Sequence, residues 1–190
     1  MLDRPVFMFN YTESWYTNMS KDKKADRINT LVIAALFAAL TTVATMIHIF
    51  PNENGYVHLG DAVIYLAASC LPGTYAFVAA AVGGALADAI GGYFIYVPVT
   101  FLVKGLLTLT FTGRRDKLLC ARNFIACAVG LVITVGGYFA AEWIMYGWAS
   151  AVGAVLGNLI QAGASAALYI VLALALDKIG FKKSVLGRGA

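Results

Sequence analysis

The chain has 190 residues, of which 61% are hydrophobic and only 13% are charged. Soluble domains carry about 25% charged residues, and the mean hydropathy here is +0.77. The composition therefore excludes an ordinary water-soluble protein and indicates an integral membrane protein. At this length we expect one helical membrane domain, because the spanning segments leave no room for a second domain.

The apolar sequence divides into six segments that we predict to be transmembrane helices. They run from about Asn29 to Phe50, Leu59 to Leu71, Thr74 to Ile90, Phe94 to Phe111, Asn123 to Tyr146 and Ala151 to Leu176. We therefore predict an all-α integral membrane protein, with a six-transmembrane-helix bundle at residues 29–178. Residues 1–28 are predicted to be an N-terminal cytoplasmic or interfacial extension, and residues 179–190 a basic cytoplasmic tail.

The Lys and Arg residues predict the orientation of these helices. All of them except Lys104 fall before the first segment, between the fourth and the fifth, or after the sixth. Cytoplasmic loops are enriched in Lys and Arg, and an even number of spans puts all three clusters on one side. We predict a multi-pass protein with both termini in the cytoplasm. The net charge of +4 follows from this topology and does not indicate a nucleic-acid partner.

With this orientation, the embedded polar residues fall in the outer half of the membrane, and Lys104 is the deepest. Ionisable groups at the helix centre cost roughly 2.5–3.5 kcal/mol each on insertion scales and usually mark function. The inner half is predicted to be almost purely apolar, which favours a binding cup over a pore. The predicted substrate-binding residues are His58, Asp61, Asp88, Tyr93, Tyr96, Thr100, Lys104, Glu142, Tyr146, Asn158 and Gln161.

Each of these charged or amide groups also has a purely structural interpretation. Lys104 either pairs with Asp61 or Asp88, which makes its burial tolerable, or binds an anionic or hydroxyl group of a ligand. Asp61 lies at a helix start and is suited to capping or favouring that N-terminus. Asn158 and Gln161, three residues apart, either join helices by hydrogen bonds or face a heteroaromatic ring.

The chain contains no phosphate-binding loop, nucleophile elbow or H-E-x-x-H sequence. We therefore predict that it is not an enzyme and has no catalytic residues, metal or cofactor of its own. Two other classes stay open, a stand-alone oligomeric channel or exchanger and a membrane metal hydrolase. The hydrolase would use residue types that can bind zinc, namely His48, His58, Asp61 and Asp88.

Three stretches of the sequence carry a resemblance to a known family. They are LGDAVIYLAA (Leu59–Ala68), GGALAD (Gly83–Asp88) and GYFIYVPVTFLVKG (Gly92–Gly105). The chain resembles the substrate-binding S components of energy-coupling factor (ECF) transporters, the vitamin importers of bacteria, over about Thr30 to Lys178. It looks most like the subgroup for riboflavin, hydroxymethylpyrimidine or vitamin B6 compounds. The resemblance implies an extracellular site that is closed by the first loop and lined by the outer halves of the fourth to sixth helices.

The resemblance also implies partners and a location. The partners are a membrane T subunit and two cytosolic ATPase subunits, which hydrolyse the ATP, in the bacterial cell membrane. The first helix would dock on the T subunit through small-xxx-small patterns, which let helices approach closely. These patterns are Ala34 with Ala38 and Ala35 with Ala39. Within the subgroup we favour a pyridine or pyrimidine vitamin, with vitamin B6 first, while riboflavin and thiamine precursors stay open.

Overall fold

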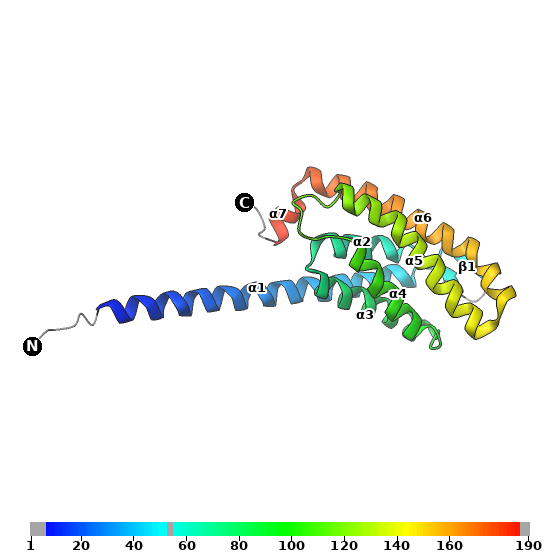
Figure 1. The fold of residues 1–190 in the computed structure, drawn as a ribbon, viewed down its shortest axis with the longest axis horizontal. Helices are drawn as coiled ribbons and strands as arrows, with labels where there is room; N and C mark the ends of the chain where they lie inside the picture. The colour runs from blue at the N-terminus through cyan, green and yellow to red at the C-terminus, as the bar shows by residue number, and fades with distance from the viewer. Residues whose placement is uncertain (1–6, 53–54, 187–190) are drawn as a thin grey trace, which may run out of the picture.

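The computed structural model describes the backbone of residues 7–52 and 55–186, with side chains for residues 25–49 and 57–184. The helices and strands are α1 (Phe7–Met46), β1 (Phe50–Asn52), β2 (Gly55–Val57), α2 (Gly60–Cys70), α3 (Gly73–Gly91), α4 (Val97–Thr110), α5 (Ala121–Tyr146), α6 (Trp148–Lys178) and α7 (Phe181–Leu186). Strands β1 and β2 form an antiparallel hairpin in which Phe50 pairs with Val57. The helices form an elongated bundle, and α1 extends well beyond it (Figure 1).

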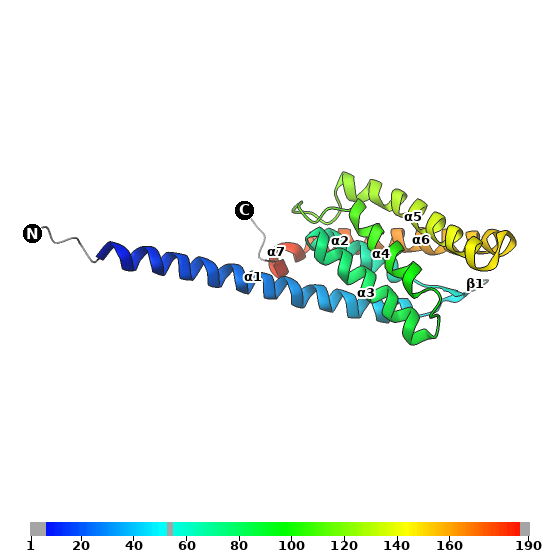
Figure 2. The same ribbon diagram turned by 60° about the horizontal axis from the view of Figure 1, so that its bottom comes forward.

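Helix α2 lies at the centre of the bundle. It packs against α1, α3, α4 and α6, and ten of its eleven residues are buried. Helices α5 and α6 pack along each other on one side, while α3 packs on α1 and α4 on the other (Figure 2). A helix that is buried all round is apolar on every face, and this explains the run of small and apolar residues from Ala62 to Ala68.

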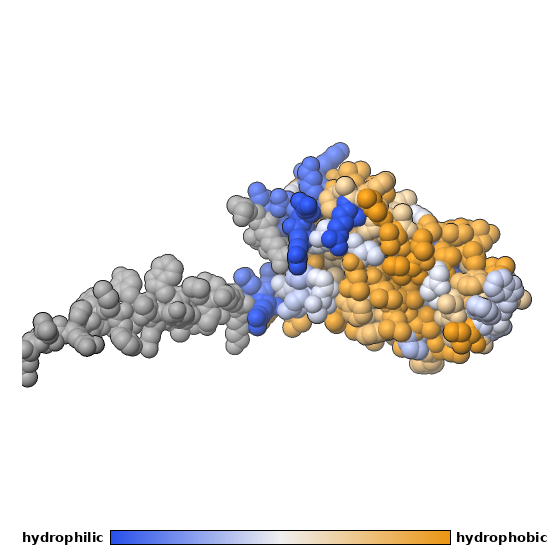
Figure 3. Space-filling model, viewed as in Figure 1, coloured by the Kyte–Doolittle hydropathy of each residue, from blue (hydrophilic) through white to orange (hydrophobic). Residues whose placement is uncertain are grey.

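The two ends of the bundle differ in composition. The hairpin end carries β1, β2 and the turns at Gly92 and Gly147. The basic end carries α7, the loop at residues 111–120 and the start of α5, and its exposed cationic side chains include Arg114, Arg115, Lys117, Arg122, Lys178 and Lys183. Between the ends the visible surface is mainly hydrophobic (Figure 3). This pattern is typical of a protein that lies in a bilayer with its basic end at one interface.

Among the described residues, four helices are long and apolar enough to cross a membrane, namely α1 from Ala25 onward, α3, α5 and α6. Helices α2 and α4 are apolar but have 11 and 14 residues, so at 1.5 Å per residue they are only about 17 and 21 Å long. The hydrocarbon core of a bilayer is about 30 Å thick. The chain is thus an integral membrane helical protein, and the count of six spans stays a prediction.

The predicted segments agree with α2 to α6 within three residues at each end. Pro98 lies in the first turn of α4, where its missing N–H does no harm. The first segment differs, because α1 begins at Phe7 and ends at Met46, four residues before the predicted end at Phe50. There the chain turns into the hairpin, and the Ile49 N–H donates to the Val57 carbonyl at 2.8 Å.

Both predicted terminal segments contain helix. The backbone of the predicted N-terminal extension is helical from Phe7 onward, and α7 falls within the predicted tail. Residues 1–6, 53–54 and 187–190 lie outside the described residues, and so do those parts of the two terminal predictions and of the first loop.

The basic end is held together by a buried polar network. The Asn123 side chain accepts from the Thr112 N–H at 2.8 Å and donates to the Leu118 carbonyl at 2.8 Å and the Ser69 hydroxyl at 3.2 Å. The Tyr169 hydroxyl lies 2.7 Å from the Ser69 hydroxyl. The prediction of an almost purely apolar inner half is therefore wrong. Single polar residues within apolar segments converge here only because the helices pack together.

A second group of contacts fixes α7 and the loop before α5. The Asp177 carboxylate accepts from the backbone N–H groups of Leu118 and Leu119 at 2.7 and 3.0 Å. Lys182 is buried, and its ammonium donates to the Ser69 carbonyl at 2.7 Å and to the Arg115 carbonyl. Carbonyl groups at a helix C-terminus lack intrahelical partners, so Lys182 satisfies one at the end of α2.

Helices α1 and α3 approach each other very closely. A Cβ atom at Gly83 would lie 2.6 Å from the Ala38 carbonyl oxygen, and the Thr42 hydroxyl donates to the Gly83 carbonyl at 2.9 Å. The face of α1 that carries Ala34 and Ala38 therefore packs inside the molecule. Ala35 and Ala39 are exposed instead.

Candidate functional site

An ion pair lies at the centre of the candidate site. The Lys104 ammonium of α4 donates to Asp61 Oδ1 of α2 at 2.6 Å, and neither side chain is exposed to solvent. Gln161 of α6 donates to the other carboxylate oxygen of Asp61 at 3.4 Å. Three helices thus converge on one buried carboxylate. Such a pair needs good geometry and further hydrogen bonds to offset its desolvation, and the lysine and the amide provide them.

Asp61, and not Asp88, is the partner of Lys104 in this ion pair. Asp88 is buried near the end of α3. It follows Gly84 by one turn on the same helix face, and a Cβ atom at Gly84 would lie within 3.0 Å of the Thr100 and Lys104 side chains. Asp88 therefore faces the same region from a fourth helix. Lys104 therefore has the pairing role that the sequence offered as one of its two interpretations.

Tyr138 of α5 is a site residue that the sequence did not single out. Its hydroxyl lies 3.0 Å from the Thr100 hydroxyl, and the Lys104 ammonium lies 5.2 Å from the centre of its ring. A cation over an aromatic face is stabilised by the ring quadrupole. Tyr138 precedes the predicted Glu142 by four residues, so both lie on one face of α5. That spacing was the signal available in the sequence.

Aromatic rings connect the ion pair with the hairpin end. Tyr96 is buried, and its ring centre lies 6.5 Å from that of Tyr138 and 6.2 Å from that of Tyr146. Tyr146 is 45% exposed and lies at the rim. Tyr93 is half-buried against the same cluster. Glu142 is buried on α5 between Tyr138 and Tyr146, so the acidic group lies on the face that these rings occupy.

Among the buried polar atoms of the site, the Asn158 amide nitrogen and the Tyr96 hydroxyl make no hydrogen bond of normal geometry within the described part of the chain. Asn158 is three residues before Gln161 on the same face of α6. Buried polar atoms are usually paired, so both atoms are suited to binding the polar groups of a ligand.

At the start of α2, the side chain that accepts a hydrogen bond from the backbone is His58 and not Asp61. The His58 Nδ1 atom accepts from the Gly60 N–H at 3.0 Å, whereas the helix has no side-chain cap at its N-cap residue, Leu59. Burial, together with the nearby Lys104 charge, lowers the pKa of His58 from 6.5 to about 3. His58 is therefore neutral at physiological pH, with Nδ1 available as an acceptor.

This shift predicts a pH-dependent stability. Because the folded state has the lower His58 pKa, the unfolded state binds more protons between pH 3 and 6.5, and stability falls as the pH falls through that window. At pH 5 the expected loss relative to pH 7.5 is about 2 kcal/mol. His58→Asn keeps an acceptor but cannot be protonated, so it should remove this part of the loss. Thermal unfolding in detergent at both pH values measures the loss of stability. An equal loss in the variant would contradict the claim that protonation of His58 causes it.

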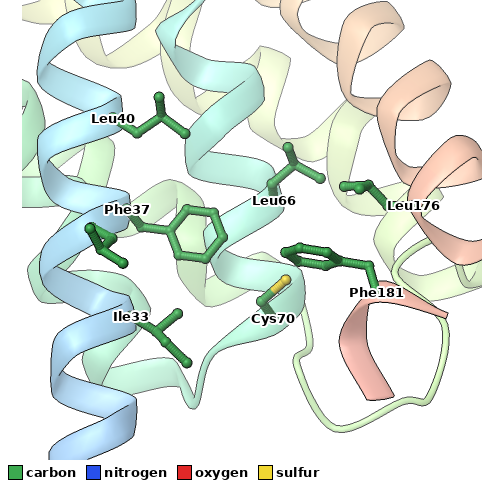
Figure 4. Close-up of a pocket in the computed structure, with 8 residues that line it drawn as sticks. Ile33, Phe37, Leu40, Leu66, Cys70, Leu176 and Phe181 are labelled. Atoms are coloured by element: carbon green, nitrogen blue, oxygen red, sulfur yellow. The ribbon is translucent and has the colours of Figure 1, made fainter. Parts of the chain in front are cut away.

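A pocket in the described structure lies away from this polar site. It has a volume of about 290 Å³ and is almost entirely apolar. Helices α1, α2, α6 and α7 line it near the basic end (Figure 4). Its lining residues are Ile33, Leu36, Phe37, Leu40, Leu66, Cys70, Leu176 and Phe181. None of the predicted substrate-binding residues is among them.

Among the described residues, no group of three or more His, Cys, Asp or Glu side chains is arranged to hold a metal ion.

The fold and the site thus define a polytopic helical membrane protein with a buried, charged and aromatic site toward one end. The family model for the ECF-type riboflavin transporter, S component, matches residues 25–178. Because this range is most of the chain, the chain belongs to the family of ECF-type riboflavin transporter S components. The resemblance predicted from the sequence is confirmed.

Two relatives agree with this membership. The chain is 28% identical over 156 residues to the thiamine precursor transporter HmpT of Lactococcus lactis subsp. cremoris, with 80% of this chain and 90% of the relative covered. It is also 28% identical over 128 residues to an uncharacterized protein of Pyrococcus woesei, with 65% and 84% covered. The family and the first relative are transporter components and not enzymes, and they support a role in vitamin uptake.

Proposed function

We propose that this chain is the vitamin-binding subunit of an ATP-driven importer in a bacterial cell membrane, with six spans and both termini in the cytoplasm. It captures its ligand at the hairpin end and delivers it through a membrane T subunit and two ATPase subunits. The observation that carries the proposal is the Asp61–Lys104 pair with Gln161, buried in a chain of the S component family. The chain itself contributes no cofactor.

The ligand that we propose is a single-ring pyridine or pyrimidine vitamin compound. The sequence favoured vitamin B6, and the relative HmpT is a thiamine precursor transporter, so we rank a pyrimidine precursor first and vitamin B6 second. The Tyr96 and Tyr138 rings provide faces on which a flat ring can stack. The Asn158 amide and the Tyr96 hydroxyl provide hydrogen bonds to ring nitrogen or hydroxyl groups. Riboflavin is the alternative that the family's description gives.

Reconstitution into liposomes tests the class. With T and ATPase subunits present, the proposal predicts uptake of the radiolabelled ligand that requires ATP. The chain alone should bind the ligand but produce no flux across the bilayer. Flux by the chain alone would instead support the stand-alone channel or exchanger.

The surface for the T subunit is proposed to be Ala35 with Ala39. The alternative pair, Ala34 with Ala38, contacts α3 through Ala38 and is therefore not available to a partner. Ala39→Trp should leave the Tm unchanged and abolish co-purification with the T subunit, because a bulky ring prevents close helix approach. Ala38→Trp should instead destabilise the fold by overpacking α1 against α3.

Ala128→Trp, on an exposed position of α5, is the matched control for the effect of an added surface ring. It should retain both the Tm and the co-purification. Normal T subunit binding by Ala39→Trp would contradict this choice of register.

A further inference from the structure

Three hydroxyl groups in the middle of the bundle are buried without a hydrogen-bond partner among the described residues. They belong to Tyr65 of α2, Thr134 of α5 and Ser165 of α6, all fully buried. None of the three oxygens makes a hydrogen bond within the described part of the chain. A single unsatisfied buried hydroxyl is destabilising, and native interiors contain few of them. Three on adjacent helices therefore require an explanation.

The contacts of α2 and α6 place Tyr65 and Ser165 at the same level along the bundle. Gln161 donates to Asp61 near the start of α2, and the Tyr169 and Ser69 hydroxyls are bonded near its end. Tyr65 lies midway between Asp61 and Ser69, and Ser165 lies midway between Gln161 and Tyr169. Since residues four apart share a helix face, Tyr65 and Ser165 both lie between the ion pair and the basic-end network.

Helix α5 places Thr134, which carries the third hydroxyl, in the same part of the bundle, between the ion pair and the basic-end network. A Cβ atom at Gly130 would lie 3.0 Å from the Tyr65 hydroxyl oxygen, so this hydroxyl contacts α5 at Gly130. Thr134 follows one turn later on the same face, and Tyr138 follows after another turn and bonds Thr100. Thr134 thus lies between the Tyr65 hydroxyl and the candidate site. The absence of a side chain at Gly130 lets the Tyr65 hydroxyl pack directly against α5, and any larger residue would crowd it.

We propose that Tyr65, Thr134 and Ser165 form an internal hydration site that holds at least one ordered water molecule. A buried water needs two to four polar partners, and three hydroxyls, each able to donate and to accept, provide them. The water lies between the Asp61–Lys104 pair and the Ser69, Asn123 and Tyr169 network, at the level of the bundle where Tyr65 and Ser165 lie. The proposal is independent of the vitamin that the protein binds.

Substitution of Thr134 by valine separates a hydrated site from a dry one by the sign of its effect. In a dry interior, Thr134→Val removes an unsatisfied hydroxyl at nearly constant shape, and the Tm should rise. In the hydrated site it removes a partner of the water, and the Tm should fall by a few degrees. Thr108→Val is the control, because the Thr108 hydroxyl donates to the Gly105 carbonyl and its loss should lower the Tm. A raised Tm for Thr134→Val overturns the proposal.

Radiolytic hydroxyl-radical labelling of the purified chain in detergent detects the water directly. Radicals that form from a bound water should label the Tyr65 ring several-fold more than the Tyr169 ring, whose hydroxyl is already bonded to Ser69 and Leu118. Labelling of Tyr65 should fall in the folded double variant Thr134→Val/Ser165→Ala. Labelling of Tyr65 no greater than that of Tyr169, or unchanged in the double variant, overturns the proposal.

Discussion

Lys104→Met is expected to destabilise the protein by about 3–5 kcal/mol, because it leaves the Asp61 carboxylate buried without its cation. The carboxylate is inaccessible to solvent, and its other partner in the described structure is the Gln161 amide at 3.4 Å. One amide hydrogen bond does not replace a lysine at 2.6 Å. Thermal unfolding in detergent, followed by tryptophan fluorescence, measures the loss.

The double variant Lys104→Met/Asp61→Asn is the control that separates stability from binding. Replacing a buried ion pair by neutral groups is often close to neutral for stability, and the new amide still provides an oxygen for Gln161. We expect the double variant to fold with a Tm near that of the wild type and to bind ligand at least about tenfold more weakly, a loss of about 1.4 kcal/mol. A stable single variant, with Lys104 removed and Asp61 intact, would contradict the ion pair.

Asn123→Ala should cost about 3 kcal/mol, because each buried group that loses its partner costs about 1–3 kcal/mol. The fully buried Asn123 amide bonds the backbone of Thr112 and Leu118 and the Ser69 hydroxyl. Its loss releases the loop at residues 111–120, so amide hydrogen exchange in that loop should rise together with the fall in Tm.

The exposed neighbour Arg122 is the matched control for this prediction. Its side chain donates to the Thr110 carbonyl at 3.4 Å, and Arg122→Ala should cost less than about 0.5 kcal/mol, as for other surface substitutions. Equal effects of the two variants would show that the polar network at the basic end does not stabilise the loop.

The sequence was sufficient to predict α2 to α6, because apolar segments separated by proline, glycine and basic loops correspond directly to these helices. It also predicted that Asp61, Lys104 and Gln161 belong to one region, since buried charges must be paired. It could not decide between Asp61 and Asp88 as the partner of Lys104. Both lie at the hairpin end, and only the packing of α2 against α4 places one carboxylate at the ammonium.

The features that the sequence did not predict depend on contacts between distant segments. Ser69, Asn123 and Tyr169 are single polar residues in apolar helices, and their convergence appears only in three dimensions. The sequence predicts that Lys182 is a solvated residue of the tail, yet its ammonium binds the Ser69 carbonyl at the end of α2. The two alanine registers on α1 are equivalent in sequence, and Gly83 of α3 distinguishes them.

Ligand binding by the purified chain, without ATP or any partner subunit, tests the central claim most directly. Isothermal titration with a pyrimidine thiamine precursor, vitamin B6 compounds and riboflavin should show one-to-one, submicromolar binding of one single-ring compound, about −8 kcal/mol or stronger. The double variant at Lys104 and Asp61 should bind that compound at least about tenfold more weakly. If none of these compounds binds the folded chain, or if the double variant binds as tightly as the wild type, the buried ion pair is not part of a vitamin-binding site.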